Sequence, residues 1–194
     1  VLLSGAARFN YFNTIRENRG TFTLRHKNHF TTAGDLLNSG EIRIESNARL
    51  NVSGNLTVDE GAVFVDETSV LDVGTDTIEV IGGSIHVERG AVPLFVNTPW
   101  IVREKWQGLD DDGNNIVLPA VVSYGDAWFP TIGPDAEILV EGEQARLEPL
   151  VGLSRIQGSL TLSGGNELRL PQSLTNEGTL QLQTAAKLYV EGDM

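Results

Sequence analysis

Apolar and polar residues alternate in short phrases along most of the chain. From Asn38 to Gly90 a glycine or a polar turn is followed repeatedly by an apolar pair with one polar residue between its members. The spacing i, i+2 places both apolar side chains on one face of a strand and the polar one on the other. The pattern predicts short, half-buried strands, and their apolar pairs are Ile42/Ile44, Leu50/Val52, Leu56/Val58, Val63/Val65, Leu71/Val73, Ile78/Val80 and Ile85/Val87.

A longer period is superimposed on these strands. Each strand with its turn takes about seven residues, so three of them take about 21, and this shift carries Ile42 onto Val63 and then close to Ile85. Near the other end of the chain the corresponding shift is 20 residues. The further pairs that it brings together are Leu50 with Leu71, Leu56 with Ile78, Leu160 with Leu180 and Leu168 with Leu188. Such register predicts apolar ladders that run along a stack of coils.

The fold class that this pattern favours is all-β, a right-handed parallel β-helix with about 20–22 residues and three short strands per coil. A meander of hairpins is disfavoured, because neither Asn-Gly nor Asp-Gly occurs between Asn38 and Gly90. A β-sandwich is the alternative. Glycines fall between the predicted strands, where we expect positive φ angles at the corners; they are Gly40, Gly54, Gly61, Gly74, Gly83 and Gly90.

The repeat divides the chain into three parts. Residues 1–91 are predicted to form solenoid coils, with an irregular start over 1–20. Residues 92–133 break the pattern with prolines and large aromatic residues, and Asp112-Gly113 is a good hairpin signal. We expect this part to be an insertion on the side of the solenoid, in the form of a hairpin; coils with longer strands and irregular corners are the alternative. Residues 134–194 resume the coils.

Composition narrows the range of partners. The chain has a net charge of −12, which opposes binding to nucleic acid and to anionic membrane surfaces. It has no cysteine, and no stretch approaches the roughly 18 apolar residues of a membrane span. Both ends of the sequence fall within the pattern, so we expect a piece of a longer chain. Its open coil edges predict end-to-end self-association.

The acidic cluster Asp110, Asp111 and Asp112 is a weak candidate for a calcium site. It does not fit an EF-hand loop, because counting from Gly113 at the sixth position puts Gly108 first and Pro119 twelfth. A solvated turn is the simpler interpretation. No other cofactor is predicted.

The aromatic residues of the interruption are candidates for ligand binding. Flat apolar rings suit sugar rings, and the candidates are Trp100, Trp106, Trp128 and Tyr124. The alternative is that they form the small core of the insertion. No residue is assigned a catalytic role, because no constellation of nucleophile, base or paired carboxylates is evident.

Several phrases resemble the repeats of bacterial autotransporter passengers and related β-helix surface proteins. They are the phrases from Asn38 to Ile44, from Leu50 to Val58 and from Gly158 to Gly165. The resemblance implies a secreted or cell-surface location and a non-enzymatic structural or adhesive role, with another surface protein or a glycan as partner. Some relatives of this architecture cleave glycans, so a glycan-binding or glycan-cleaving β-helix is the alternative. Fold analogy alone assigns no activity.

Overall fold

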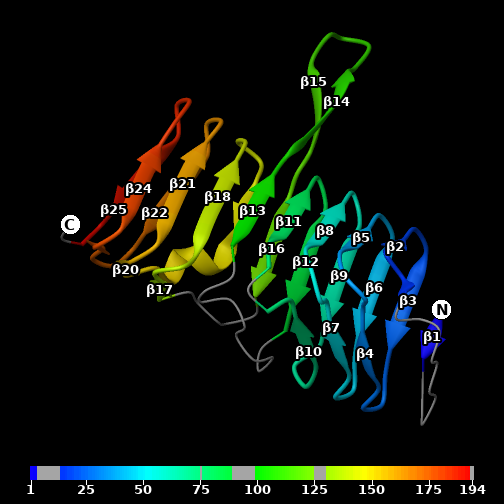
Figure 1. The fold of residues 1–194 in the computed structure, drawn as a ribbon. Coiled ribbons are helices and arrows are strands. Elements are labelled where there is room, and N and C mark those ends of the chain that lie inside the picture. The colour runs from blue at the N-terminus through cyan, green and yellow to red at the C-terminus, as the bar shows by residue number, and fades with distance from the viewer. Residues whose placement is uncertain (4–13, 75, 89–98, 125–129, 193–194) are drawn as a thin grey trace.

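The chain forms an all-β solenoid of about 8 turns, as the computed structural model in Figure 1 shows. The structure describes residues 1–3, 14–74, 76–88, 99–124 and 130–192. Strands of successive coils lie side by side and run parallel. The predicted class is confirmed, and the β-sandwich alternative is wrong because each sheet is built from successive coils. Within the described ranges, no helical segment has the length and hydrophobicity that a membrane crossing requires.

Two long sheets form two sides of the solenoid. Sheet A contains β1 (Leu2–Leu3), β3 (Thr21–Leu24), β6 (Glu41–Ile44), β9 (Ala62–Val65), β12 (Ser84–Val87), β16 (Val121–Tyr124) and β19 (Arg146–Leu147). Sheet B contains β2 (Glu17–Asn18), β5 (Leu36–Asn38), β8 (Leu56–Asp59), β11 (Ile78–Ile81), β13 (Trp100–Arg103), β18 (Glu137–Glu141), β21 (Ser159–Ser163) and β24 (Thr179–Leu182).

Shorter sheets complete the coils. In the first half the third strand of each coil is β4 (His29–Thr31), β7 (Arg49–Asn51) or β10 (Val70–Asp72). In the second half there are two short sheets, one of β17 (Thr131–Ile132), β20 (Arg155–Ile156) and β23 (Thr175–Asn176), the other of β22 (Glu167–Leu170) and β25 (Lys187–Val190). A 3-10 segment, η2 (Glu148–Gly152), follows β19. An antiparallel hairpin of β14 (Lys105–Leu109) and β15 (Asn115–Leu118) stands apart from the coils.

The apolar ladders run in the predicted register. Val63 pairs with Ile42 on one side and with Ile85 on the other, and all three side chains are at most 1% exposed. The other predicted pairs, whose members lie 20 to 22 residues apart, are also present: Leu50 with Leu71, Leu56 with Ile78, Leu160 with Leu180 and Leu168 with Leu188. Inward positions therefore form one continuous core through the stack.

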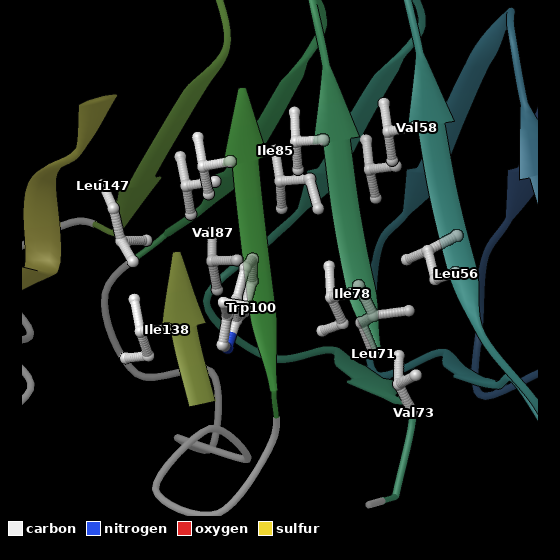
Figure 2. Close-up of a cluster of buried hydrophobic side chains, with 14 of the residues drawn as sticks. Leu56, Val58, Leu71, Val73, Ile78, Ile85, Val87, Trp100, Ile138 and Leu147 are labelled. Carbon is white, nitrogen blue, oxygen red and sulfur yellow. The ribbon is translucent and has the colours of Figure 1, made fainter. Parts of the chain in front are cut away.

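The interruption is smaller than residues 92–133. Trp100 pairs with Ile78 of the preceding coil and with Ile138 of the following coil, so β13 is a coil strand whose ladder position holds a tryptophan (Figure 2). β16 likewise pairs with β12, and β17 with β20. Among the residues of this segment that the structure describes, 99–124 and 130–133, the hairpin is the part that leaves the stack. The seven-residue pattern fails here because longer connections separate these strands, although the coils themselves continue.

Most corner glycines are needed for a reason other than the predicted one. Gly74 has the expected positive φ of +63°. Gly40, Gly61 and Gly83 do not show positive φ, but a Cβ on Gly61 would lie 2.7 Å from the carbonyl oxygen of Gly40, and one on Gly83 would lie 2.6 Å from that of Gly61. These glycines allow the backbones of successive coils to approach closely at one corner. The requirement comes from the neighbouring coil and not from the local turn.

Buried asparagine side chains hold the same corner together. Asn38 is fully buried, and its Nδ2 donates to the carbonyl oxygens of Gly40, at 3.2 Å, and of Ala62, at 3.0 Å. Its Oδ1 accepts a hydrogen bond of 2.7 Å from Nδ2 of Asn18 in the coil before it. The polar groups of the corner are thus satisfied inside the stack.

The last described coil leaves part of its ladder uncovered. Leu182 is 48% exposed, and Leu180, Leu188 and Val190 are only partly buried against the core. End-to-end self-association through this coil stays a prediction.

The ladder assignment predicts opposite responses to the same charge on the two faces of a strand. Val63→Asp places a carboxylate without a partner among aliphatic side chains, and should lower the free energy of unfolding by roughly 3–5 kcal/mol. Thr57→Asp lies on the outer face and should lower it by about 1 kcal/mol or less. Urea unfolding measures both, and equal losses would contradict the face assignment.

The close approach of successive coils at Gly40, Gly61 and Gly83 predicts that a single added methyl group there lowers the stability of the fold. Gly61→Ala should lower the free energy of unfolding by about 1–3 kcal/mol, because its Cβ would lie 2.5 Å from the carbonyl oxygen of Asn38. Gly34→Ala is the matched control, since a Cβ there meets no atom within 4 Å. Thermal unfolding of the two variants compares them, and a similar loss in both would show that the close approach is not the cause.

Candidate functional site

The β14–β15 hairpin leaves the solenoid at the corner between sheet B and sheet A. It connects β13 with β16, and Figure 1 shows it projecting beyond the edge formed by the other corners. Lys105 pairs with Leu118 and Trp106 with Val117 in antiparallel register, and a bulge follows Trp106. β14 and β15 pair only with each other, so both outer edges of this ribbon carry unpaired backbone groups.

The base of the hairpin is fixed to the preceding coils. Nζ of Lys105 lies 2.7 Å from Oδ1 of Asp59 and 2.9 Å from Oε1 of Glu60. These two carboxylates, Asp59 foremost, raise the pKa of Lys105. A Cβ on Gly82 would lie 2.7 Å from Cβ of Lys105 and 2.9 Å from Cβ of Leu118, so the absence of a side chain at Gly82 allows the hairpin to approach this corner.

Glu104 fixes the base to the following coil. Its backbone N–H donates to the carbonyl oxygen of Glu141 at 3.1 Å, and its Oε2 accepts a hydrogen bond of 2.9 Å from the backbone N–H of Gln144. A Cβ on Gly142 would collide with the Glu104 side chain. With Lys105 bound on one side and Glu104 on the other, the hairpin is held at a defined point between two coils.

Asp110 organises the hairpin turn. Its Oδ1 accepts hydrogen bonds from the backbone N–H groups of Asp112, at 2.9 Å, and of Asn114, at 2.8 Å. The bond from Asn114 is the main cause that lowers the pKa of Asp110. Gly113 has a φ of +82°, as a tight turn requires. Asp110 thus has a structural role in the turn, and calcium binding by Asp110, Asp111 and Asp112 stays a prediction.

The ribbon itself is apolar and exposed. Trp106 is 64% exposed, Leu109 60% and Ile116 41%, which makes three of the six exposed large hydrophobic residues in the described part of the chain. Residues opposite one another on a ribbon share a face, which puts Trp106 beside Val117. The indole Nε1 of Trp106 donates to Oδ1 of Asn115 at 3.3 Å and restrains the ring.

The structure separates the aromatic residues predicted to bind a ligand. Trp100 is fully buried in the sheet B ladder, so its assignment as a ligand-binding residue is wrong. The reason is that its position repeats the apolar rung of β11, which the irregular spacing conceals. Trp128 and the side chain of Tyr124 lie outside the described residues. Trp106 is the candidate that the structure places on the surface.

The anchors of the hairpin were not predicted from sequence. Glu104 and Lys105 are ordinary charged residues in an irregular segment, and their partners lie at Asp59, Glu60 and Gln144. The only signal for them is that the 22-residue coil spacing places Ile81 beside Arg103, which brings the corners after β11 and β13 together. A partner 40 or more residues away gives no local pattern.

The fold defines the class of this protein as a parallel β-solenoid, and within the described ranges the β14–β15 hairpin projects from one of its corners. No protein-family description, no curated protein and no solved structure matches the sequence. The class therefore rests on the structure itself.

The two-sided anchoring predicts that the hairpin loosens locally when one anchor is removed. Lys105→Met deletes the contacts with Asp59 and Glu60, and these half-exposed ion pairs contribute about 1 kcal/mol or less to global stability. Amide hydrogen exchange should accelerate in β14 and β15 while β8 and β11 keep their protection. Unchanged exchange in the hairpin would contradict the anchoring role, and Arg155→Gln, in an ion pair far from the hairpin, is the control.

Proposed function

We propose that this chain is a non-enzymatic structural or adhesive segment of a secreted or cell-surface protein, and that the β14–β15 hairpin is its recognition element. The observation that carries the proposal is the contrast between the two ends of the hairpin. Its base is fixed to two coils through Lys105 and Glu104. Its ribbon exposes Trp106, Leu109 and Ile116.

The coil stack suits a rigid support. Each coil contacts only its neighbours, so a solenoid can present a site far from its ends without a change in the core. Ion pairs also connect successive coils on the outside, namely Arg25 with Glu45 at 2.6 Å, Arg49 with Asp72 at 2.5 Å, Arg155 with Glu177 at 2.7 Å and Lys187 with Glu167 at 2.6 Å. A support of this kind keeps the hairpin at a constant position for binding.

An exposed apolar ribbon favours binding to a partner. Large apolar side chains that gather on a surface mark interaction sites more often than scattered ones do, and tryptophan is enriched among residues that dominate binding energy. The unpaired edges of β14 and β15 also allow a partner strand to add to the ribbon. The resemblance to bacterial surface β-helix repeats points to the same role.

Glycan binding is the second candidate, and one observation favours it. The Trp106 ring is exposed and is held in place through its bond to Asn115. An immobilised indole presents a flat apolar surface to a sugar ring at little entropic cost. Cleavage of a glycan would require two carboxyl groups about 5–9.5 Å apart across the bound sugar, and no such pair is assigned.

The test removes the outer part of the β14–β15 hairpin and leaves its base and the coils in place. Replacement of Gln107 to Asn115 by a short Gly-Ser turn should leave the solenoid folded, because these residues contribute no rung to the ladders. The melting temperature by circular dichroism should fall by only a few degrees, and retention on arrays of glycans and of cell-surface proteins should be lost. Retention by a glycan rather than by a protein would select the second candidate.

A single substitution separates specific recognition by the hairpin from nonspecific hydrophobic adsorption. Trp106→Ala should abolish retention on the arrays. Leu182→Ala is the control and should leave retention unchanged, because Leu182 is also an exposed apolar residue but lies on the last described coil and not on the hairpin. Loss of the fold on replacement of the tip would mean that the hairpin supports the coils. An intact fold with undiminished retention in the Trp106 variant would place recognition elsewhere.

A further inference from the structure

The two outer edges of the β14–β15 ribbon, which projects from the coils in Figure 1, differ in their suitability for pairing. On β14 the register skips Gln107, between Trp106 and Gly108. A bulge of this kind twists an edge and disturbs the pattern to which another strand could bind. β15 has no such bulge, and its four residues Asn115–Leu118 include none of the lysines or prolines that protect natural edges. The edge of β15 is therefore the one that favours addition of a strand.

One face of the ribbon presents apolar side chains beside this edge. Trp106 lies opposite Val117, and Leu109 lies opposite Asn115. Because Asn115 and Val117 are two residues apart on β15, these four side chains share a face. Trp106 and Leu109 are mostly exposed there. A strand added to β15 would place every second side chain on this face.

The turn at the end of the ribbon is acidic. Between Trp106 and Leu118 its charged residues are Asp110, Asp111 and Asp112. Asp110 accepts hydrogen bonds from backbone N–H groups of the turn. The side chains of Asp111 and Asp112 are exposed and make no ion pair with any described residue. A partner that approaches the turn meets negative charge that the chain itself leaves uncompensated.

The base of the hairpin is also negative. Nζ of Lys105 is shared between Asp59, at 2.7 Å, and Glu60, at 2.9 Å, so two carboxylates face one ammonium group. On the other side of the base the carboxylate of Glu104 accepts a hydrogen bond from a backbone N–H group. Charge of one sign at both ends of the ribbon attracts a cationic partner and repels an acidic one.

We propose that the hairpin binds an extended segment of a partner protein in which basic residues flank an apolar stretch, and that this segment pairs with β15. Its apolar side chains lie against Trp106 and Leu109, and its basic side chains lie beside Asp111 and Asp112. The inference rests on the hairpin being the recognition element, and adds the backbone conformation and the charge of the partner. A second copy of this chain is disfavoured, because its hairpin brings the same acidic turn.

The test measures retention of the whole chain on an array of octapeptides. One set has the pattern Lys-Lys-X-Thr-X-Thr-Lys-Lys, with valine, isoleucine, phenylalanine or tyrosine at X, and two matched sets carry glutamine or glutamate in place of lysine. We expect retention on the lysine set, roughly fivefold less on the glutamine set and none on the glutamate set. Methylation of the four central amide nitrogens should abolish retention, because it removes the donors that a pairing strand needs. Equal retention on the lysine and glutamine sets would overturn the charge preference.

Two double variants of equal net charge separate the acidic turn from the overall charge of the chain. Asp111→Asn with Asp112→Asn keeps Asp110 and its hydrogen bonds, and should lower retention on the lysine set by about threefold or more. Glu67→Gln with Asp76→Asn is the matched control, because it removes two exposed carboxylates from the corners before β10 and β11. Equal losses in the two variants would show that the turn is not the cause. A circular dichroism melt that matches the parent chain establishes that each variant is folded.

The outcomes also distinguish this inference from the proposed function. Retention on the lysine set that persists in Trp106→Ala, or with the methylated peptides, would overturn strand pairing at the ribbon. If no peptide set retains the chain while retention on the glycan or surface-protein array still depends on Trp106, the cationic segment is wrong and the hairpin stays the recognition element. If retention on neither array depends on Trp106, both are wrong.

Discussion

The parallel register between successive coils is the constraint on which the rest of this structure depends. Each strand of one coil is hydrogen-bonded to the equivalent strand of the next, so residues 20–22 positions apart must have compatible side chains. Aliphatic residues at the inward positions, glycine where backbones meet and asparagine at one buried corner all follow from this. A charge or a methyl group in the wrong place disturbs two neighbouring coils at once.

The feature of functional interest occurs where this register is interrupted. The hairpin is inserted at a corner between β13 and β16, which otherwise stack as coil strands. The inward side chains of a regular coil fill the interior, so an added element can only project from a corner. Variation at corners changes the surface while the core is kept.

The sequence by itself determined the faces of the strands, the coil length and the ladder partners, because these follow from the spacing of apolar residues along a repeat. It did not distinguish Trp100 in the core from Trp106 on the ribbon, since an isolated tryptophan has the same local pattern in either place. It also missed the anchors Glu104 and Lys105. Burial, charge compensation and empty space at a residue depend on what the adjacent coil places against it, and where the repeat is irregular only the tertiary structure decides which residues become neighbours.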